Sequence, residues 1–518
     1  MATAAIDILP KRMIGRPLFV ATIFTGSFLL FLMQPMIARM ALPRLGGAPA
    51  VWNSAMLVYQ ALLLGGYAYA HLIGRLSARR QAGLHIAVLL IAALWLPLGL
   101  RDLTLPENAS PILWVPWLLL ASIGPLFFAV SAQAPLIQRW VAIQAPDANP
   151  YSLYIASNLG SFGGLIAYPL LVEPLMPLAS QSLIWSAAYA LLLMLMAGCA
   201  WMLPSQRPGF AQATATSPRP SLKLRLWWII LAAVPSGLIL AITTHLTTDI
   251  IAMPLIWVIP LGLYLLSFSF AFSETSRVAA VFTRYFPLIL VIAGTMSGSG
   301  KAFSLWSSIS ADVLLLFGVA VVLHHRLYRM RPDVAHLTDF YLCMSIGGVV
   351  GGLFCALIAP AVFDALYELP ILVVAAALLM PAPVDAPVLS AFQRRWTLIG
   401  CLGFSMLAGG LFGPQPIYII AAALVVAAVL ARRAIGHRLL FSTLIAVLIL
   451  GLGGWSDIVK PLGNNIRTRS YFGIYTIRTS QDARTLSHGT TVHGIQLRKP
   501  GLETYPATYY VPMSGVGL

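Results

Sequence analysis

Long apolar stretches separated by short polar connections fill most of this chain, from Pro17 to Gly453. A helix needs roughly 20 apolar residues to cross the hydrocarbon core of a bilayer and tolerates about 17 to 25. The stretches that approach this length lie at about 17–41, 51–74, 83–100, 111–135, 151–172, 180–203, 226–249, 253–273, 281–298, 304–325, 338–361, 366–381, 396–413, 415–431 and 438–453. Because the last four are short, the pattern predicts 14 or 15 transmembrane helices.

Composition points to the same fold class. Hydrophobic residues make up 59% of the 518 residues and charged residues only 9%, with a mean hydropathy of +0.85. So few charges exclude a water-soluble globule. The chain is therefore predicted to be an all-α polytopic membrane protein whose main partner is the lipid bilayer.

The positive charges are distributed unevenly among the predicted loops. With the N-terminus in the cytoplasm, 21 of the 32 Lys and Arg residues fall in inward loops, seven fall in the C-terminal tail, and only Arg39, Arg44, Arg101 and Lys301 face outward. Positive residues are retained on the cytoplasmic side of membranes. The pattern predicts a multi-pass protein of the bacterial inner membrane with a cytoplasmic N-terminus. It also explains the net charge of +16 without a nucleic-acid partner.

The chain divides into four parts. Residues 204–224 are rich in Pro, Ser and Ala, carry no apolar run and are predicted to be a cytoplasmic linker. This linker separates a first membrane half, 1–203, from a second half, 225–453, which has extra C-terminal helices. Residues 454–518 are predicted to form a small β domain.

The two halves look related. Residues 151–165 align without gaps on 339–353, with five identities that include Gly160 with Gly348 and Gly164 with Gly352. Internal repeats are typical of transporters in which two halves move around a central site. Small residues three or four apart also let helices approach closely, and the glycines fit that role equally well.

Polar side chains inside apolar spans are the candidates for a membrane site, because each is costly in lipid. His245 and Asp249 are four residues apart, so they share a helix face and are expected to pair. Gln34, Asn158 and Asp312 are further inward candidates. Together they predict a membrane cavity for a small molecule, of the polyamine or organic cation type. The alternative is that Asp249 reaches water at the outer end of its helix.

An aromatic and amide stripe runs along the second predicted helix. It consists of Trp52, Asn53, Tyr59, Gln60, Tyr67 and Tyr69. Such a stripe suits anchoring at the membrane interface, and it also suits a cage for a cationic amine. The four cysteines fall in spans without the spacing of a zinc site or a disulfide framework, so no metal and no cofactor is predicted.

The pattern changes after Trp455. Segments 470–479, 485–498 and 507–513 are rich in Tyr, Thr, Ile and Val and are separated by polar turns. These are strand signals, and they predict about four to six short strands. A tail of this size makes only a marginal core by itself.

Several long strings resemble one known family. They include LLFLMQPMIARMALPRLGG (29–47), PYSLYIASNLGSFGGL (150–165) and TTHLTTDIIAMPLIW (243–257) in the spans, and YFGIYTIRT (471–479) and LSHGTTVHGIQ (486–496) in the tail. They are similar to bacterial membrane proteins in which a major-facilitator-like region is fused to a spermidine synthase-like domain. The tail resembles the small N-terminal β domain of spermidine synthase.

This resemblance implies that Gln496 and Tyr510 are the tail positions near a polyamine pocket. The family's following domain, which holds the S-adenosylmethionine-type donor through a Gly-rich turn, has no counterpart before the last residue, Leu518. No catalytic residue is therefore assigned, and this chain is not expected to act as an enzyme alone.

Three hypotheses remain open from the sequence. The first is a membrane protein that binds or transports a small molecule and carries a non-catalytic tail. The second is an accessory or structural subunit of a membrane complex, with a protein partner at the C-terminal β domain. The third is the membrane-anchored part of an aminopropyltransferase that obtains its donor-binding domain in trans.

Overall fold

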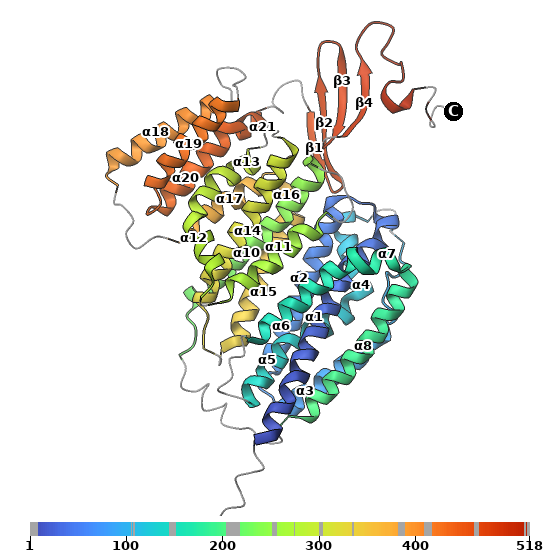
Figure 1. Ribbon diagram of the computed structural model, residues 1–518. Coiled ribbons are helices and arrows are strands. Elements are labelled where there is room, and N and C mark those ends of the chain that lie inside the picture. The colour runs from blue at the N-terminus through green and yellow to red at the C-terminus, as the bar shows by residue number, and fades with distance from the viewer. Residues whose placement is uncertain are drawn as a thin grey trace, which may run out of the picture.

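A helical body with a small β-sheet at one end forms the chain (Figure 1). The computed structural model describes residues 9–104, 106, 109–144, 152–203, 218–250, 256–273, 275–299, 304–333, 336–381, 389–408, 417–459, 466–489, 491–511 and 514. In these residues, nine helices are long and apolar enough to cross a membrane, and three shorter apolar helices accompany them. The predicted class, a polytopic helical membrane protein with a small C-terminal antiparallel sheet, is confirmed.

The described residues contain fewer full-length spans than the sequence predicted. The stretches 83–100 and 366–381 form helices of only 15 and 11 residues, α3 (Ala78–Ala92) and α17 (Glu368–Leu378). Pro97 and Pro381 lie just beyond them. Proline has no backbone N–H and clashes with the preceding turn, so neither helix continues through its proline.

The outer surface of the body is apolar. Along α8 (Leu178–Trp201), the side chains of Leu183, Met194 and Trp201 are 68%, 64% and 89% exposed. Contiguous exposed apolar surface of this kind suits contact with lipid, where helices satisfy all their own backbone hydrogen bonds.

A first helical unit comes from the N-terminal part of the chain. It contains α1 (Leu9–Leu45), α2 (Pro49–Ile73), α3, α4 (Pro111–Ser131), α5 (Gln133–Gln144), α6 (Ser152–Ala167) and α8. The π-helical segment η2 (Tyr168–Val172) and the short α7 (Glu173–Leu175) extend α6. Helices α4 and α5 follow each other almost directly and make one long span, Pro111–Ala142.

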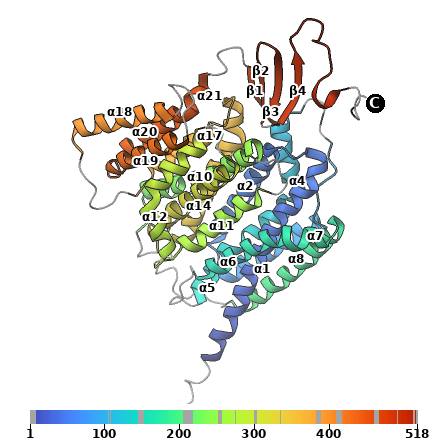
Figure 2. The same ribbon diagram turned by 45° about the horizontal axis from the view of Figure 1, so that its top comes forward.

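A second helical unit follows residues 204–217, which lie outside the described part. It contains α10 (Leu222–His245), η3 (Leu246–Ile250), α11 (Val258–Ala271), α12 (Arg277–Ile289), η4 (Leu290–Gly294), α13 (Thr295–Gly298), α14 (Leu305–Arg329), α15 (Leu337–Leu353), η6 (Phe354–Ile358), α16 (Ala359–Val362) and α17. Serine hydroxyls cap the first turns of α10, α12 and α14: Ser221, Ser276 and Ser304 accept from the backbone N–H three residues on. Beside this unit lie α18 (Ala391–Ala408), α19 (Ile417–Arg433), α20 (Arg438–Ile449), η7 (Leu450–Gly454) and α21 (Trp455–Val459) (Figure 2).

The two units use the same packing scheme. Within each unit, the first long helix packs most extensively on the fifth: α1 on α6, and α10 on α15. The second helix packs on the fourth in both, as α2 on α4 and α11 on α14. Between the units the contacts are reciprocal, because α2 of the first packs on α15 of the second, and α11 of the second packs on α6 of the first.

Glycines make the close helix pairs. A Cβ at Gly160 or Gly164 of α6 would overlap main-chain carbonyl oxygens of α1, those of Phe24 and Phe28. A Cβ at Gly347 or Gly351 of α15 would overlap carbonyl oxygens of α10 in the same way. The spatial equivalents are therefore Gly160 with Gly347 and Gly164 with Gly351, one residue away from the gapless sequence alignment.

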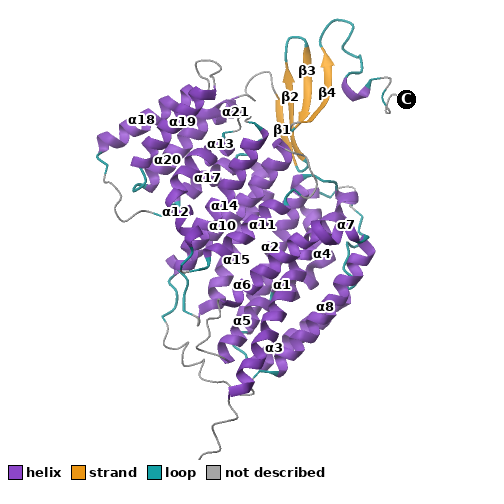
Figure 3. Cartoon of the chain, in the orientation of Figure 1, coloured by secondary structure: helices purple, strands orange, loops and turns teal. Residues whose placement is uncertain are grey.

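The C-terminal sheet is a four-stranded antiparallel meander (Figure 3). Its strands are β1 (Ile466–Ser470), β2 (Gly473–Thr479), β3 (Ala483–His488) and β4 (Thr491–Leu497). A bulge lies between Leu486 and Ser487 of β3. The predicted strand at 507–513 is not formed in the described residues, where Thr508–Tyr510 is a 3-10 turn. The sheet lies at the end of the body away from the N-terminal end of α1 (Figures 1 and 2).

The β1–β2 hairpin is docked onto both helical units. Arg469 makes two hydrogen bonds to the carboxylate of Glu368, at 2.7 and 3.1 Å, and the two side chains are 6% and 1% exposed. The hydroxyl of Tyr471 is 3.1 Å from that of Ser54 on α2. Burial raises the pKa of Tyr471 to about 12, so this hydroxyl keeps its proton. The hairpin thus connects α2 of the first unit to α17 of the second.

Candidate functional site

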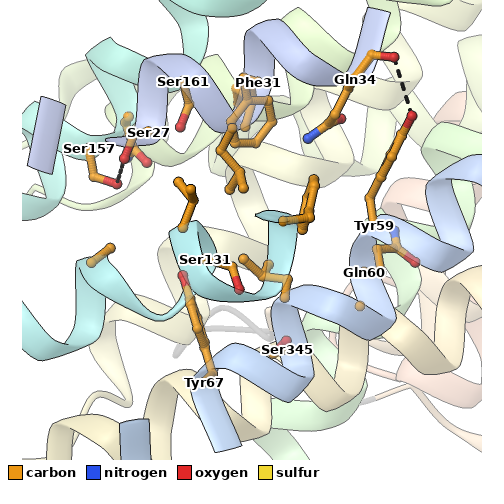
Figure 4. A pocket seen from close by; sticks show the side chains of 18 of the residues that line it. Ser27, Phe31, Gln34, Tyr59, Gln60, Tyr67, Ser131, Ser157, Ser161 and Ser345 are labelled. Carbon is orange, nitrogen blue, oxygen red and sulfur yellow. Dashed lines mark hydrogen bonds between the residues drawn. The ribbon is translucent and has the colours of Figure 1, made fainter. Parts of the chain in front are cut away.

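A central cavity of about 170 Å³ lies between the two helical units. Its walls come from α1, α2, α4, α5 and α6 of the first unit and from α10, α11 and α15 of the second. Figure 4 shows labelled polar side chains from several of these helices around the cavity. The walls include α2, α6, α11 and α15, the four helices that form the reciprocal contacts, so the cavity sits on the boundary between the units.

Hydrogen bonds fix part of the polar wall and cross from helix to helix. Ser27 on α1 and Ser157 on α6 are 2.8 Å apart between their hydroxyl oxygens. The amide nitrogen of Gln60 on α2 donates to Ser236 on α10 at 2.9 Å, and Ser236 donates to the Gly348 carbonyl on α15 at 3.0 Å. The bond from Gln60 to Ser236 therefore joins the two units beside the cavity.

Other polar atoms of the lining residues have no hydrogen-bond partner in the part of the chain that the structure describes. They are Oε1 of Gln34, Oε1 of Gln60, Oε1 of Gln133, Nδ2 of Asn158 and Oγ of Ser345. Nearly all buried polar groups in proteins are hydrogen-bonded, and a buried group without a partner costs about 1–3 kcal/mol. Oε1 of Gln60 lies against Gly352 of α15, outside the lining residues, whereas the other four atoms belong to residues that line the cavity, which favours a binding site for polar groups.

The cavity wall carries no formal charge. Among the described residues that line the cavity, none is Asp, Glu, Lys, Arg or His. Its remaining surface is apolar or aromatic, with Phe31, Phe127 and Phe268 among the lining residues. The site therefore offers neutral hydrogen-bonding groups on an apolar background.

A second pocket of about 310 Å³ lies nearer the sheet end of the body. Arg39 and Glu173 line it and form an ion pair at 3.0 Å. Trp52 of α2 and Trp257, just before α11, also line it, and their rings stack with centroids 3.5 Å apart. Tyr59 lines both cavities, so its ring lies between the central cavity and the outer pocket, whereas Trp52 and Trp257 line the outer pocket alone.

Two of the residues predicted for the membrane site line the central cavity. Gln34 and Asn158 both face it and are 3% and 6% exposed. Both were predictable from the sequence as site candidates, since each is an amide inside an apolar span. Sequence alone does not distinguish these two amides from polar residues that face away from the cavity.

His245 and Asp312 lie elsewhere, between α10 and α14 of the second unit. Nδ1 of His245 is 2.9 Å from Oδ2 of Asp312, whose side chain is fully buried. The sequence instead paired His245 with Asp249, and the side chain of Asp249 lies outside the described residues. Neither His245 nor Asp312 lines the central cavity.

The structure describes the side chain of only one of the two tail positions. Gln496 is exposed on β4, and its side-chain nitrogen reaches the Glu503 carbonyl only at 3.5 Å. The side chain of Tyr510 lies outside the described residues. Among the residues that the structure does describe, no group of three His, Cys, Asp or Glu side chains is placed to hold a metal ion.

The sequence missed several residues of the cavity. Tyr59, Gln60 and Tyr67 line it, although the stripe to which they belong was assigned to interfacial anchoring or a cation cage. The helical spacing of these polar residues was the available signal. Ser131 and Ser345 also line the cavity and gave no distinctive signal.

Comparisons with known proteins add no family assignment. No family model matches the chain, and no curated protein matches it. Solved structures that do match include a POT family transporter in complex with 5-aminolevulinic acid, at 14% identity and a TM-score of 0.44, over 70% of this chain and 93% of that one. Another, described as bearing on substrate recognition in proton dependent oligopeptide transporters, matches at 14% identity and a TM-score of 0.43, over 84% of this chain and all of that one.

The resemblance to a fused major-facilitator-like and spermidine synthase-like family is therefore corrected. No model of that family or of any other matches the chain, and the solved structures that match include POT family transporters. The strings that suggested the resemblance are mostly apolar helix sequence and short strands. Such sequence recurs among unrelated membrane proteins because lipid imposes the same composition on all of them.

Proposed function

We propose that this protein transports a small molecule across a membrane through the central cavity. One observation carries the proposal: the cavity lies on the boundary between two helical units with the same packing scheme, and both units supply its wall. In transporters built from two related halves, rocking of one half against the other exposes a central site to each side in turn. The boundary position is what such a movement requires.

The stacked rings at the outer pocket support the same proposal. Trp52 belongs to the first unit and Trp257 to the second, so movement of one unit against the other would separate them. The ring of Trp52 also lies 6.4 Å from that of Tyr59, the residue that lines both cavities, so separation of the two tryptophans would free Tyr59 to open a path between the outer pocket and the central cavity. The pair therefore has the position of a gate.

The polyamine or organic cation predicted from the sequence receives less support. Asp312, the buried carboxylate described among the predicted site residues, is bonded to His245 and does not line the cavity. The proposal therefore covers small molecules in general. It keeps the predicted setting, the bacterial inner membrane with a cytoplasmic N-terminus, on the strength of the uneven loop charges.

Transport is tested with purified protein in liposomes. Proteoliposomes are incubated with a defined mixture of small organic cations, anions and uncharged solutes, and mass spectrometry identifies the trapped contents. We expect at least one solute to accumulate faster with the natural protein than with Ser345→Phe, which fills the cavity. Gln34→Leu serves as a second, less bulky variant. Identical contents in all of these and in protein-free liposomes would contradict transport.

A further inference from the structure

The walls of the central cavity carry information about the molecule it accepts. From them we infer that the ligand is uncharged, about the size of a single ring, and carries both hydrogen-bond donors and acceptors. This inference rests on the proposed function, because it names the substrate class of the same site. Three properties of the cavity support the inference: its charge, its polarity and its volume.

Charge is the first argument. An ion that enters the cavity loses its hydration and meets no opposite charge, because no lining residue is ionisable as an acid or a base other than the tyrosine hydroxyls. Desolvation of an unpaired ion is far more costly than desolvation of an uncharged polar group. The cavity thus discriminates against both cations and anions.

The unpaired wall atoms provide the second argument. Gln34 on α1 presents an amide oxygen, while Asn158 on α6 presents an amide nitrogen. Exchange of oxygen and nitrogen within an amide would alter the order of these groups but not their mixture. Ser345 on α15 adds a hydroxyl that can donate or accept. A ligand with hydrogen-bond donors and acceptors can bond to these groups, and a pure hydrocarbon cannot.

The volume and the aromatic residues provide the third argument. The cavity measures about 170 Å³, which is similar to a cavity of about 150 Å³ that holds benzene in another protein. The rings of Phe31, Phe127 and Phe268 supply apolar surface for one flat or compact ring. Polyamines are cations at neutral pH, so they do not suit the uncharged wall of this cavity.

Three probes of the same shape test the inference directly. Benzamide is uncharged, benzoate is an anion and benzamidine is a cation at neutral pH, while the ring and its planar substituent are nearly the same size. Binding to the purified full-length protein in detergent is measured by calorimetry. We expect benzamide to bind more than about tenfold tighter than either ion, because each ion loses hydration without a partner.

Variants locate the binding. Gln34→Leu and Asn158→Leu should each weaken benzamide binding by about 2- to 10-fold, the loss of one hydrogen bond. Gln496→Leu makes the same change of side chain on the exposed face of β4 and should leave binding unchanged. Folding of every variant is checked by gel filtration and circular dichroism.

The outcomes separate this inference from the proposed function. Benzamidine or benzoate binding as tightly as benzamide, or no binding of any of the three, would overturn the inference. Transport of a charged solute in the liposome assay would overturn it as well and leave transport standing. Benzamide binding without transport of any solute would preserve the uncharged site and refute the proposed function.

Discussion

Polar residues inside the helical body occur in two kinds of environment. Gln34 and Asn158 face a cavity and keep unpaired atoms. His245 and Asp312 hydrogen-bond to each other between two helices of one unit, through Oδ2 of Asp312. The sequence could predict all four as unusual residues in lipid, because composition alone shows that. The sequence could not show which of the four line a cavity and which bond to each other, because that depends on which helices are neighbours.

A substitution at Asp312 tests this division. Asp312→Ala removes the partner of His245 and should lower the free energy of unfolding by about 3 kcal/mol, as expected for breaking a buried pair. Asp312→Asn keeps an acceptor for the imidazole and should cost less. The free energy is measured by thermal unfolding in detergent, and benzamide binding is measured on the folded protein.

Benzamide binding should be the same in natural protein and in Asp312→Asn, because this residue lies outside the cavity. Loss of benzamide binding in the folded Asp312→Asn protein would show that the carboxylate belongs to the ligand site after all.

At the scale of elements, the sequence predicted most helices and the main strands. Apolar length and strand-type residues are local signals, and the four strands of the sheet lie within the predicted segments or next to them. The register of the helix repeat was missed by one residue. Backbone contact, and not residue identity, decides which of the neighbouring Gly347 and Gly348 corresponds to Gly160.

Two adjacent glycines of α6 provide a matched test of helix packing. Gly164→Ala places a methyl group on the carbonyl of Phe28 and should destabilise the protein by about 1–3 kcal/mol. Gly163→Ala meets only the Phe28 ring at 3.7 Å, an ordinary contact, and should be neutral or stabilising by up to about 1 kcal/mol. Thermal unfolding compares the two, and equal effects would count against the close α1–α6 approach.

The docking of the β1–β2 hairpin depends on a buried ion pair. Arg469→Met leaves the carboxylate of Glu368 buried without its partner, which should cost about 3–5 kcal/mol. The measurement is amide hydrogen exchange of residues 466–479, which should speed up as the hairpin undocks.

The double variant Arg469→Met with Glu368→Leu is the control for this charge effect. It removes both charges and should recover much of the protection against exchange. A double variant that exchanges as fast as Arg469→Met alone would show that hydrogen-bond geometry, not an unpaired charge, holds the hairpin.

At the scale of the whole molecule, the sequence predicted two halves and an uneven charge distribution. It left the side of the tail open, because that depends on counting every span. The structure places the sheet and the N-terminal end of α1 at opposite ends of the helical body (Figure 1). In a membrane that crosses this body, the tail and the N-terminus therefore face opposite sides.

Single cysteines at the two ends test this orientation. Gln481→Cys lies in the exposed turn between β2 and β3, and Arg80→Cys lies in the exposed first turn of α3. A membrane-impermeant thiol reagent should label Gln481→Cys in intact cells and Arg80→Cys only after permeabilisation. The reverse pattern would place the N-terminus outside, and labelling of both from one side would contradict the arrangement of the body.

Access to the central cavity from both membrane faces tests the central claim most directly. Ser345→Cys is introduced into protein whose four native cysteines, all buried, are replaced by alanine. An impermeant thiol reagent is then applied to oriented vesicles from one face or the other. The account predicts that Cys at this position reacts from either face as the units rock. Reaction from a single face, or from neither, would contradict transport through this cavity.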